Sequence, residues 1–266
     1  MPEHSVAFMQ AMSGGEALFR DGFLFLAGGD WLIAVGYHLQ GAYDAEAFTS
    51  ALDAVIRERK PEDCWAVAPQ LPPSLAPYVT ETDLFYVLPS DSPVPVKIRG
   101  PLARAAKRLR LEEGREFTAA HRRLWAEFLR RKELKPQVRE LFARTSMVLH
   151  APETDIRLLN AWDEDDGLAA CLVMDCGPEE FDSYIIGAYS RAAYVPHAGD
   201  ALFARMLESA KARGKSYIHL GLGVNEGITR FKKKWGGVPA LPFQSASWKS
   251  GDNSGRNAEG AGASAR

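Results

Sequence analysis

The order of apolar and polar positions divides this chain into short strands and amphipathic helices. Strand-like apolar runs bounded by Gly, Pro and Asp alternate with segments in which apolar residues recur every third or fourth position. Asp44 is placed to cap the first helix and Pro61 to end it. Before residue 22 we expect a loose start. The elements expected in the first part of the chain are strands at 22–26, 31–38, 64–68 and 83–88, a helix at 45–59 and a short helical turn within 69–77.

From Pro101 onward the chain becomes strongly basic. The first basic residues are expected on a helix, Thr118 is placed to cap the next helix, and the acidic turn at 163–167 predicts an antiparallel meander around it. After Trp248 the apolar residues cease, so we expect a disordered tail at 249–266. The elements expected here are a helix that carries Arg104, Lys107, Arg108 and Arg110, strands at 109–117, 156–162, 168–176, 183–191 and 217–220, helices at 119–131, 136–144, 198–213 and 226–235, and one last strand.

The last predicted helix carries a lysine on its apolar side. At about 100° per residue, Ile228, Phe231 and Trp235 form one stripe, and Lys232 falls inside it. The neighbouring lysines, 233 and 234, point elsewhere. A lysine on such a stripe either extends its ammonium group to the rim or is held there for a task.

Composition allows one large domain or two small ones. The chain has 266 residues, of which 46% are apolar and 25% charged, as in ordinary globular proteins. A net charge of −2 argues against a wholly basic nucleic-acid binder, but basic residues gather between 101 and 144. They form either solvated helix faces or a surface for a phosphate-rich partner such as coenzyme A or transfer RNA.

Several classes of protein find little support. The cysteines, Cys64, Cys171 and Cys176, are odd in number and lack CxxC spacing, so we expect reduced core residues. The histidines are scattered, and no metal site is expected. The apolar stretch 23–39 is broken by Gly28-Gly29-Asp30 and predicts a hairpin rather than a membrane span, and we expect a cytoplasmic protein.

Neither a dinucleotide-binding site nor a hydrolase triad is expected. Glycines at 221, 223 and 227 lie between a strand and a helix, but their spacing and the single strand that follows do not fit a Rossmann dinucleotide site. No G-x-S-x-G elbow supports a hydrolase triad.

The element order β-α-α-β-β-β-α-β-α-β from Leu109 to Trp248 resembles the GNAT acyltransferase fold. The segment Gly227–Gly237, GITRFKKKWGG, resembles the G-x-x-x-F-K-x-x-[FW]-G ending of Fem-type and related GNAT-like transferases. The resemblance implies an α/β (α+β) protein of two tandem GNAT-like lobes with mixed, mostly antiparallel sheets and flanking helices. The implied domains are a degenerate lobe at 1–100 and a catalytic lobe at 101–248, followed by the tail.

The resemblance also implies a donor-binding turn. GNAT enzymes that use acetyl-CoA offer backbone N–H groups to the pyrophosphate from a turn of the type [RQ]-x-x-G-x-[GA], and the equivalent here is Pro196–Ala201. Gly199 and Ala201 match, Pro196 replaces the usual Arg or Gln, and Asp200 brings a negative charge toward the phosphate site. The Fem-type side of the family, whose donors are aminoacyl-tRNAs, shares this departure.

The predicted function is that of an N-acyltransferase that moves an acyl group from acyl-CoA to an amine. Transfer from aminoacyl-tRNA in the Fem manner and a non-catalytic GNAT-like binding module are the alternatives. Acyl-CoA or aminoacyl-tRNA would act as a co-substrate rather than a bound cofactor, the acceptor would be a small-molecule or peptide amine, and tRNA would contact the basic region 101–144. The candidate catalytic residues are Lys232, His197 and Tyr194, and the candidate binding residues are Tyr189, Arg191, Gly199, Asn225 and Phe231.

Overall fold

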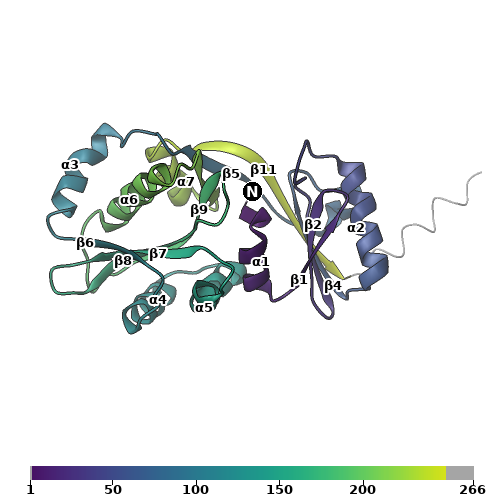
Figure 1. Cartoon of the computed structure of the whole chain (residues 1–266), viewed down its shortest axis with the longest axis horizontal. Helices are drawn as coiled ribbons and strands as arrows, with labels where there is room; N and C mark the ends of the chain where they lie inside the picture. Colours follow the sequence, from purple (N-terminus) through teal and green to yellow (C-terminus); the bar gives the residue numbers. More distant parts are fainter. Residues whose placement is uncertain (1, 250–266) are drawn as a thin grey trace, which may run out of the picture. The chain divides into compact units, whose positions relative to one another are not determined.

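The computed structural model describes residues 2–249, with only the backbone of Gln137. Its internal contacts define two compact units, one from Glu3–Leu84 together with residues 241–249, and one from Phe85–Ala240. Strands β5 (Val79–Pro89) and β11 (Val238–Lys249) each pass from one unit into the other (Figure 1). This division by contacts does not test the predicted lobes 1–100 and 101–248, which stay a prediction. Apart from Lys249, the predicted tail lies outside the described residues.

The first unit is a small sheet with one long helix along a face (Figure 1). Its strands follow the order β1-β2-β3-β4-β11, in which β3 and β4 run parallel and the other neighbours antiparallel. Phe48, Leu52 and Val55 of the helix pack on the apolar residues of β2 and β3. The elements are α1 (Val6–Ser13), β1 (Glu16–Arg20), β2 (Phe23–Ala27), β3 (Trp31–Val35), α2 (Ala45–Arg59), β4 (Asp63–Ala68) and the 3-10 turns Pro2–His4 and Pro73–Tyr78.

The expectation of a loose start was wrong. α1 ends at Gly14 in the left-handed conformation, and β1 follows directly. β1 pairs with β2 through the turn Asp21-Gly22, whose φ angles of 51° and 80° suit a tight hairpin. In contrast, the cap on α2 is as predicted, because Asp44 accepts the N–H groups of Glu46 and Ala47.

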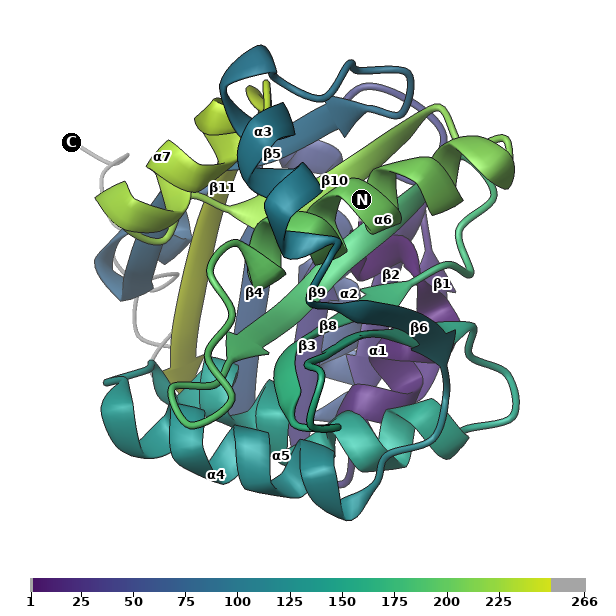
Figure 2. The same ribbon diagram turned by 90° about the vertical axis from the view of Figure 1, so that its left-hand side faces the viewer.

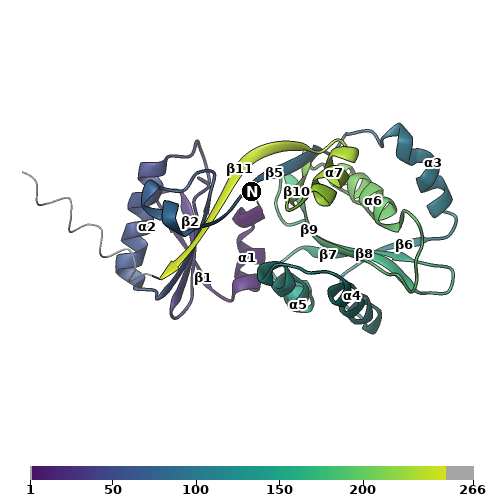
Figure 3. The same ribbon diagram turned by 180° about the vertical axis from the view of Figure 1, so that it is seen from behind.

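The second unit places helices on both faces of its sheet (Figure 2). α4 and α5 cover one face, and α3, α6 and α7 lie on the other (Figure 3). The strand order is β5-β10-β9-β8-β7-β6, in which β10 and β9 run parallel and the other neighbours antiparallel. The elements are α3 (Val96–Ala105), β6 (Arg110–Gly114), α4 (Ala119–Arg131), α5 (Pro136–His150), β7 (Ile156–Trp162), β8 (Leu168–Asp175), β9 (Phe181–Tyr189), α6 (Ala198–Ala212), β10 (Tyr217–Leu222) and α7 (Glu226–Lys234).

The meander β7-β8-β9 and the helix–strand–helix that follows it confirm the predicted order. Two details differ. The basic helix ends at Ala105, so Arg110 lies on β6, and α5 runs past residue 144 to His150 because Val148 and Leu149 are buried and continue its apolar face. Fold class is confirmed as mixed α/β with a mostly antiparallel arrangement of strands.

The core of the second unit lies between β5, β7–β10 and α6. Leu202, Met206 and Ala210 of α6 pack on Leu159 and Ile218 of the sheet. The cysteine prediction is also confirmed, since all three thiols are free and buried, and burial raises the pKa of each. Among residues 2–249, no helix is both long and apolar enough to cross a membrane.

Candidate active site

The parallel strands β9 and β10 pair over only three residues. Tyr217, Ile218 and His219 lie opposite Phe181–Ser183, and no further pair joins these two strands in the described chain. β9 continues along β8 to Tyr189, with an irregularity in register between Tyr184 and Ile186. The ends of β9 and β10 are therefore free of each other beyond Ser183 and His219, and the groups around those ends make up the candidate site.

The first turn of α6, which follows β9 along the chain, is the second part of the candidate site. His197 precedes the helix with φ 65° in the left-handed region, and Gly199 in the first turn is exposed with nothing within 4 Å of an added Cβ. The first N–H groups of a helix lack intrahelical acceptors. This turn can therefore accept a negatively charged group close to its backbone.

Asp200, in the same first turn, is buried. Its carboxylate accepts hydrogen bonds from His197 Nδ1 at 2.9 Å, Lys234 Nζ at 2.5 Å and Trp235 Nε1 at 3.0 Å. Burial alone would raise the pKa of Asp200, but these three donors together hold it below its usual value. The negative charge that Asp200 was expected to bring to a phosphate site is therefore balanced by Lys234, and phosphate binding at this turn stays a prediction.

Lys232 lies at the end of β10. The side chain is buried, its ammonium group donates to the carbonyl oxygen of Leu222, and Nζ lies 5.6 Å from the centroid of the Tyr86 ring. Gly221, with φ 71°, would place a Cβ only 4.0 Å from Nζ. The prediction that Lys232 alone of the three lysines faces inward is confirmed, since Lys233 and Lys234 are exposed.

Asn225 and Phe231 serve α7 itself. Asn225 caps the helix as predicted, its Oδ1 accepting the N–H of Ile228 at 3.0 Å. Phe231 packs edge-on against Phe203 of α6, with ring centroids 5.2 Å apart. Their described contacts are structural, so their predicted binding roles stay predictions.

The end of β9 is fixed by a residue of α4. Glu127 accepts a hydrogen bond from the Ser190 hydroxyl at 2.7 Å and one from the Arg191 N–H at 2.6 Å. Burial alone would raise the pKa of Glu127. The hydrogen bonds and the charge of Arg131 outweigh burial, so the pKa lies below its usual value. Arg131 also donates to the Tyr189 carbonyl oxygen at 2.6 Å.

Two arginines and two tyrosines stack where β9 ends. The guanidinium carbon of Arg191 lies 5.6 Å from the ring centroids of both Tyr189 and Tyr194, and that of Arg131 lies 5.0 Å from Tyr189. Tyr194 is half exposed. Among the described residues, Arg191 has no acidic partner, so its N–H groups are available to an anion. The structure thus brings together three of the candidate residues, Tyr189, Arg191 and Tyr194, whereas His197 pairs with Asp200.

The sequence analysis did not single out Glu127, Ser183 or His219. His219 is 2% exposed, its Nδ1 accepts the N–H of Gly221 at 3.1 Å, and its ring lies 4.8 Å from that of Phe85. Burial, followed by positive charge that includes Lys232, lowers its pKa to about 3. The signal available in the sequence for the last two was a serine and a histidine inside predicted strands, where most neighbours are apolar.

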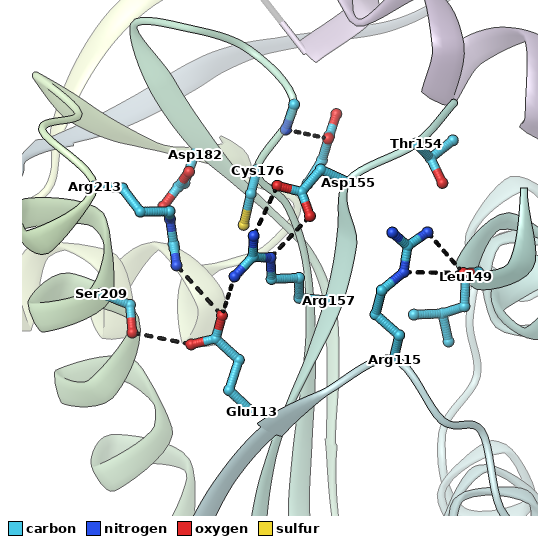
Figure 4. A network of polar contacts seen from close by, with 12 residues as sticks. Glu113, Arg115, Leu149, Thr154, Asp155, Arg157, Cys176, Asp182, Ser209 and Arg213 are labelled. Carbon is cyan, nitrogen blue, oxygen red and sulfur yellow. Dashed lines mark hydrogen bonds and ion pairs between the residues drawn. The ribbon is translucent and has the colours of Figure 1, made fainter. Parts of the chain in front are cut away.

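A second polar network holds the far end of α6 (Figure 4). Arg157 binds Glu113 at 2.7 Å and Asp155 at 2.8 Å, and Arg213 binds the fully buried Asp182 at 2.6 Å. The side chains of Glu113 and Arg157 meet at the centre of this network (Figure 4). This network ties the last turn of α6 to β6, β7 and β9, and so helps to hold the helix whose first turn faces the site.

The groups of this site offer hydrogen-bond donors and positive charge, which are suited to acyl transfer. Between residues 2 and 249 no group of three or more His, Cys, Asp or Glu side chains is arranged to hold a metal ion. An exposed helix start, an unpaired arginine and a buried ammonium group instead offer donors to phosphate and to a polarised carbonyl.

Comparison with solved structures shows the same fold at low identity. L-PGS from Bacillus licheniformis is 14% identical with a TM-score of 0.58, over 92% of this chain and 91% of that one. FemX is 12% identical with a TM-score of 0.58, over 90% of each chain. A GCN5-related N-acetyltransferase from Kribbella flavida is 13% identical with a TM-score of 0.55, over 92% of this chain and 94% of that one.

The family follows from the sequence comparison. No curated protein matches this chain. The model of the acetyltransferase (GNAT) domain matches residues 97–233, which contain every candidate site residue. Because this match spans just over half of the 266 residues, the protein belongs to the acetyltransferase (GNAT) domain family and is an acyltransferase.

Proposed function

We propose that this acyltransferase moves an acyl group from acyl-CoA to a primary amine. The observation that carries the proposal is the inward position of Asp200, which removes the negative charge expected beside the first turn of α6. The backbone N–H groups of that turn then meet the pyrophosphate of coenzyme A without an opposing carboxylate. Gly199 leaves room for the approach.

Arg191 extends this phosphate site. Its guanidinium group is held by stacking between Tyr189 and Tyr194 rather than by an acid, and its backbone is fixed by Glu127. An arginine held in this way binds phosphate without first breaking an ion pair. It supplies the positive charge that the family motif places at the position of Pro196.

The proposed catalytic roles belong to three residues. Lys232, buried at the end of β10, would stabilise negative charge that develops on the transferred carbonyl. His197 donates Nδ1–H to Asp200, which leaves Nε2 as an acceptor for the proton that the attacking amine loses. Tyr194 is half exposed nearby and would return a proton to the leaving thiolate.

Aminoacyl-tRNA is the second candidate donor. Its support is the resemblance to Fem-type transferases and a set of exposed basic side chains on and after α4. That set is Arg122, Arg123, Arg130, Lys132, Lys135 and Arg139.

Calorimetric titration with acetyl-CoA and with transfer RNA tests the choice of donor. We expect acetyl-CoA to bind, with an affinity that depends on salt only through the charges of its own phosphates. We also expect the mass spectrum of the natively purified protein to show bound coenzyme A. Binding of charged tRNA that weakens steeply with salt, with no binding of acetyl-CoA, would instead select the second donor. Arg191→Gln should weaken acetyl-CoA binding. Arg123→Gln, which removes another exposed arginine, is the matched control and should not.

A further inference from the structure

His219 and Ser183 form a buried polar pair inside the strands of the second unit. They lie directly opposite each other in the parallel pairing of β10 with β9, and they are the last pair before these strands part. Their side chains are 2% and 0% exposed. Neither has been given a role so far. Above, the charge that develops on the transferred carbonyl was given to Lys232 alone, and this pair would add hydrogen bonds beside that positive charge.

Both side chains point to the face of the sheet opposite α6. Phe181, two residues before Ser183, stacks on Tyr217 with ring centroids 5.1 Å apart and contacts the His219 ring at 6.2 Å. Alternation along a strand therefore puts Phe181, Ser183, Tyr217 and His219 on one face. Ile218, the residue between, packs in the core with α6.

The pair presents hydrogen-bond donors that lack an acceptor. Because Nδ1 of His219 accepts the Gly221 N–H, the neutral ring carries its proton on Nε2. Neither this Nε2 nor the Ser183 hydroxyl has a hydrogen-bond partner among the described residues. Buried donors without acceptors are costly, so a partner from outside the chain is expected to occupy the site.

The nearest carboxyl group favours a neutral acceptor. Asp175 of β8 lies opposite Ser183 in the antiparallel pairing, so a carboxyl group belongs to the same polar row. It is buried and accepts the Gly177 N–H at 2.9 Å. A second negative charge beside it, from a phosphate or a carboxylate, would be disfavoured, whereas a carbonyl oxygen brings only a partial charge.

We propose that Nε2–H of His219 and the Ser183 hydroxyl bind the oxygen of the acyl carbonyl, a role that rests on the proposed acyl-CoA donor. In the transfer, the amine nitrogen bonds to the carbonyl carbon and the oxygen becomes an oxyanion held by these two donors. The C–S bond then breaks, the oxygen returns to a carbonyl, and the proton lost by the amine ends on the thiol of coenzyme A. Both donors emerge unchanged, and a neutral imidazole serves as the electrophilic group.

The test is isotope-edited infrared spectroscopy of acetyl-CoA labelled with ¹³C at the carbonyl. Bound to the wild type, the carbonyl band should move to lower frequency than in free acetyl-CoA, because hydrogen bonds weaken the C=O bond. Ser183→Ala and His219→Phe should each return the band toward the free position, and turnover should fall on the order of a hundredfold. His219→Gln, which keeps an N–H donor, should retain part of the shift.

The controls separate this inference from the proposed function. Ser209→Ala removes another buried serine, one that donates to Glu113 at 3.2 Å, and should leave the band unchanged. Thermal unfolding checks that each variant is folded, and Ser183→Ala is the smallest change if His219→Phe is unstable. Normal acetyl-CoA binding with the same band in wild type and variants would overturn the inference alone, and would indicate that water fills the site. Absence of any acetyl-CoA binding would overturn both proposals.

Discussion

The indole N–H of Trp235 donates a 3.0 Å hydrogen bond to the carboxylate of Asp200, and both side chains are buried. This contact joins the first turn of α6 to the residue that ends α7. The same carboxylate binds Lys234 and His197. One acid thus fixes the helix start that we assign to phosphate binding and the imidazole that we assign to proton transfer.

Replacing Asp200 by Asn should destabilise the protein. Asparagine keeps an acceptor oxygen but loses the charge that Lys234 and His197 bind, so we expect unfolding free energy to fall by about 1–3 kcal/mol. The native pKa of Asp200 is lowered, so its stabilising effect is present above the usual pKa of an aspartate and is lost as pH falls through the native value. Urea unfolding at pH 7 and pH 3 measures both effects.

The control for that measurement is Asp165→Asn. Asp165 lies in an exposed turn and no contact of its carboxylate is described, so stability should stay within about 0.5 kcal/mol of wild type. Equal losses in the two variants would contradict the role of Asp200.

Lys232→Met separates a structural lysine from a functional one. Methionine keeps the apolar stem but removes the ammonium group near Leu222 and Tyr86, so turnover should fall on the order of a hundredfold with folding intact. Lys233→Met, on the exposed side of the same helix, should stay close to wild type in a steady-state assay. Lys234→Met is a poor control, because Lys234 binds Asp200 and its loss should lower stability. Similar turnover for the variants at 232 and 233 would remove Lys232 from the chemistry.

Glu127→Gln should loosen the end of β9 without changing any residue that contacts the acyl donor directly. The amide loses the charge that attracts Arg131 and weakens the hydrogen bonds from Ser190 and Arg191. We expect KM for the acyl donor to rise about tenfold with a smaller change in kcat, since the altered residues position Arg191. Glu133→Gln, an exposed acid that follows α4, serves as the control and should change neither constant. A change in kcat alone would argue against a positioning role.

The protein should lose stability as pH falls below the ordinary histidine range. The pKa of His219 is lowered to about 3, so between pH 6.5 and pH 3 the unfolded chain binds a proton that the folded chain does not. Stability contributed by the neutral ring is therefore present at pH 7 and decreases on acidification. Burial also lowers the pKa of His4 and His121, which should add to the slope. Denaturant titrations at pH 7.5 and pH 5 should show a smaller difference for His219→Phe than for wild type.

Local patterns were sufficient for much of the fold. Asp44, Thr118 and Asn225 all stand at helix starts, as their side chains and positions predicted, and the bounds of β7 were found unchanged. The stripe on α7 also placed Lys232 on the inward side of the helix, although Ile228 of the same stripe is exposed. These features depend on neighbours within a few residues, which is the range over which helical and strand periodicity operates.

Contacts between distant segments could not be read in the same way. Asp200 was expected beside a phosphate because nothing local reveals that Trp235 and Lys234 return to meet it. Glu127 is far along the chain from Ser190, whose hydroxyl it binds. The opposition of Ser183 and His219 exists only once β9 and β10 pair, and their unmatched donors appear only after the core closes around them.

The path of β11 has a consequence for synthesis of the chain. The first unit needs a strand from the end of the sequence, because Gln244–Lys249 pair with β4, whereas Phe85–Ala240 are continuous. A ribosome therefore delivers every residue of the second unit before it delivers the strand that completes the first. Until then, the edge of β4 lacks the partner it has in the finished protein and is open to unwanted pairing. The first unit should therefore be completed after the second, although most of its residues precede those of the second unit in the sequence.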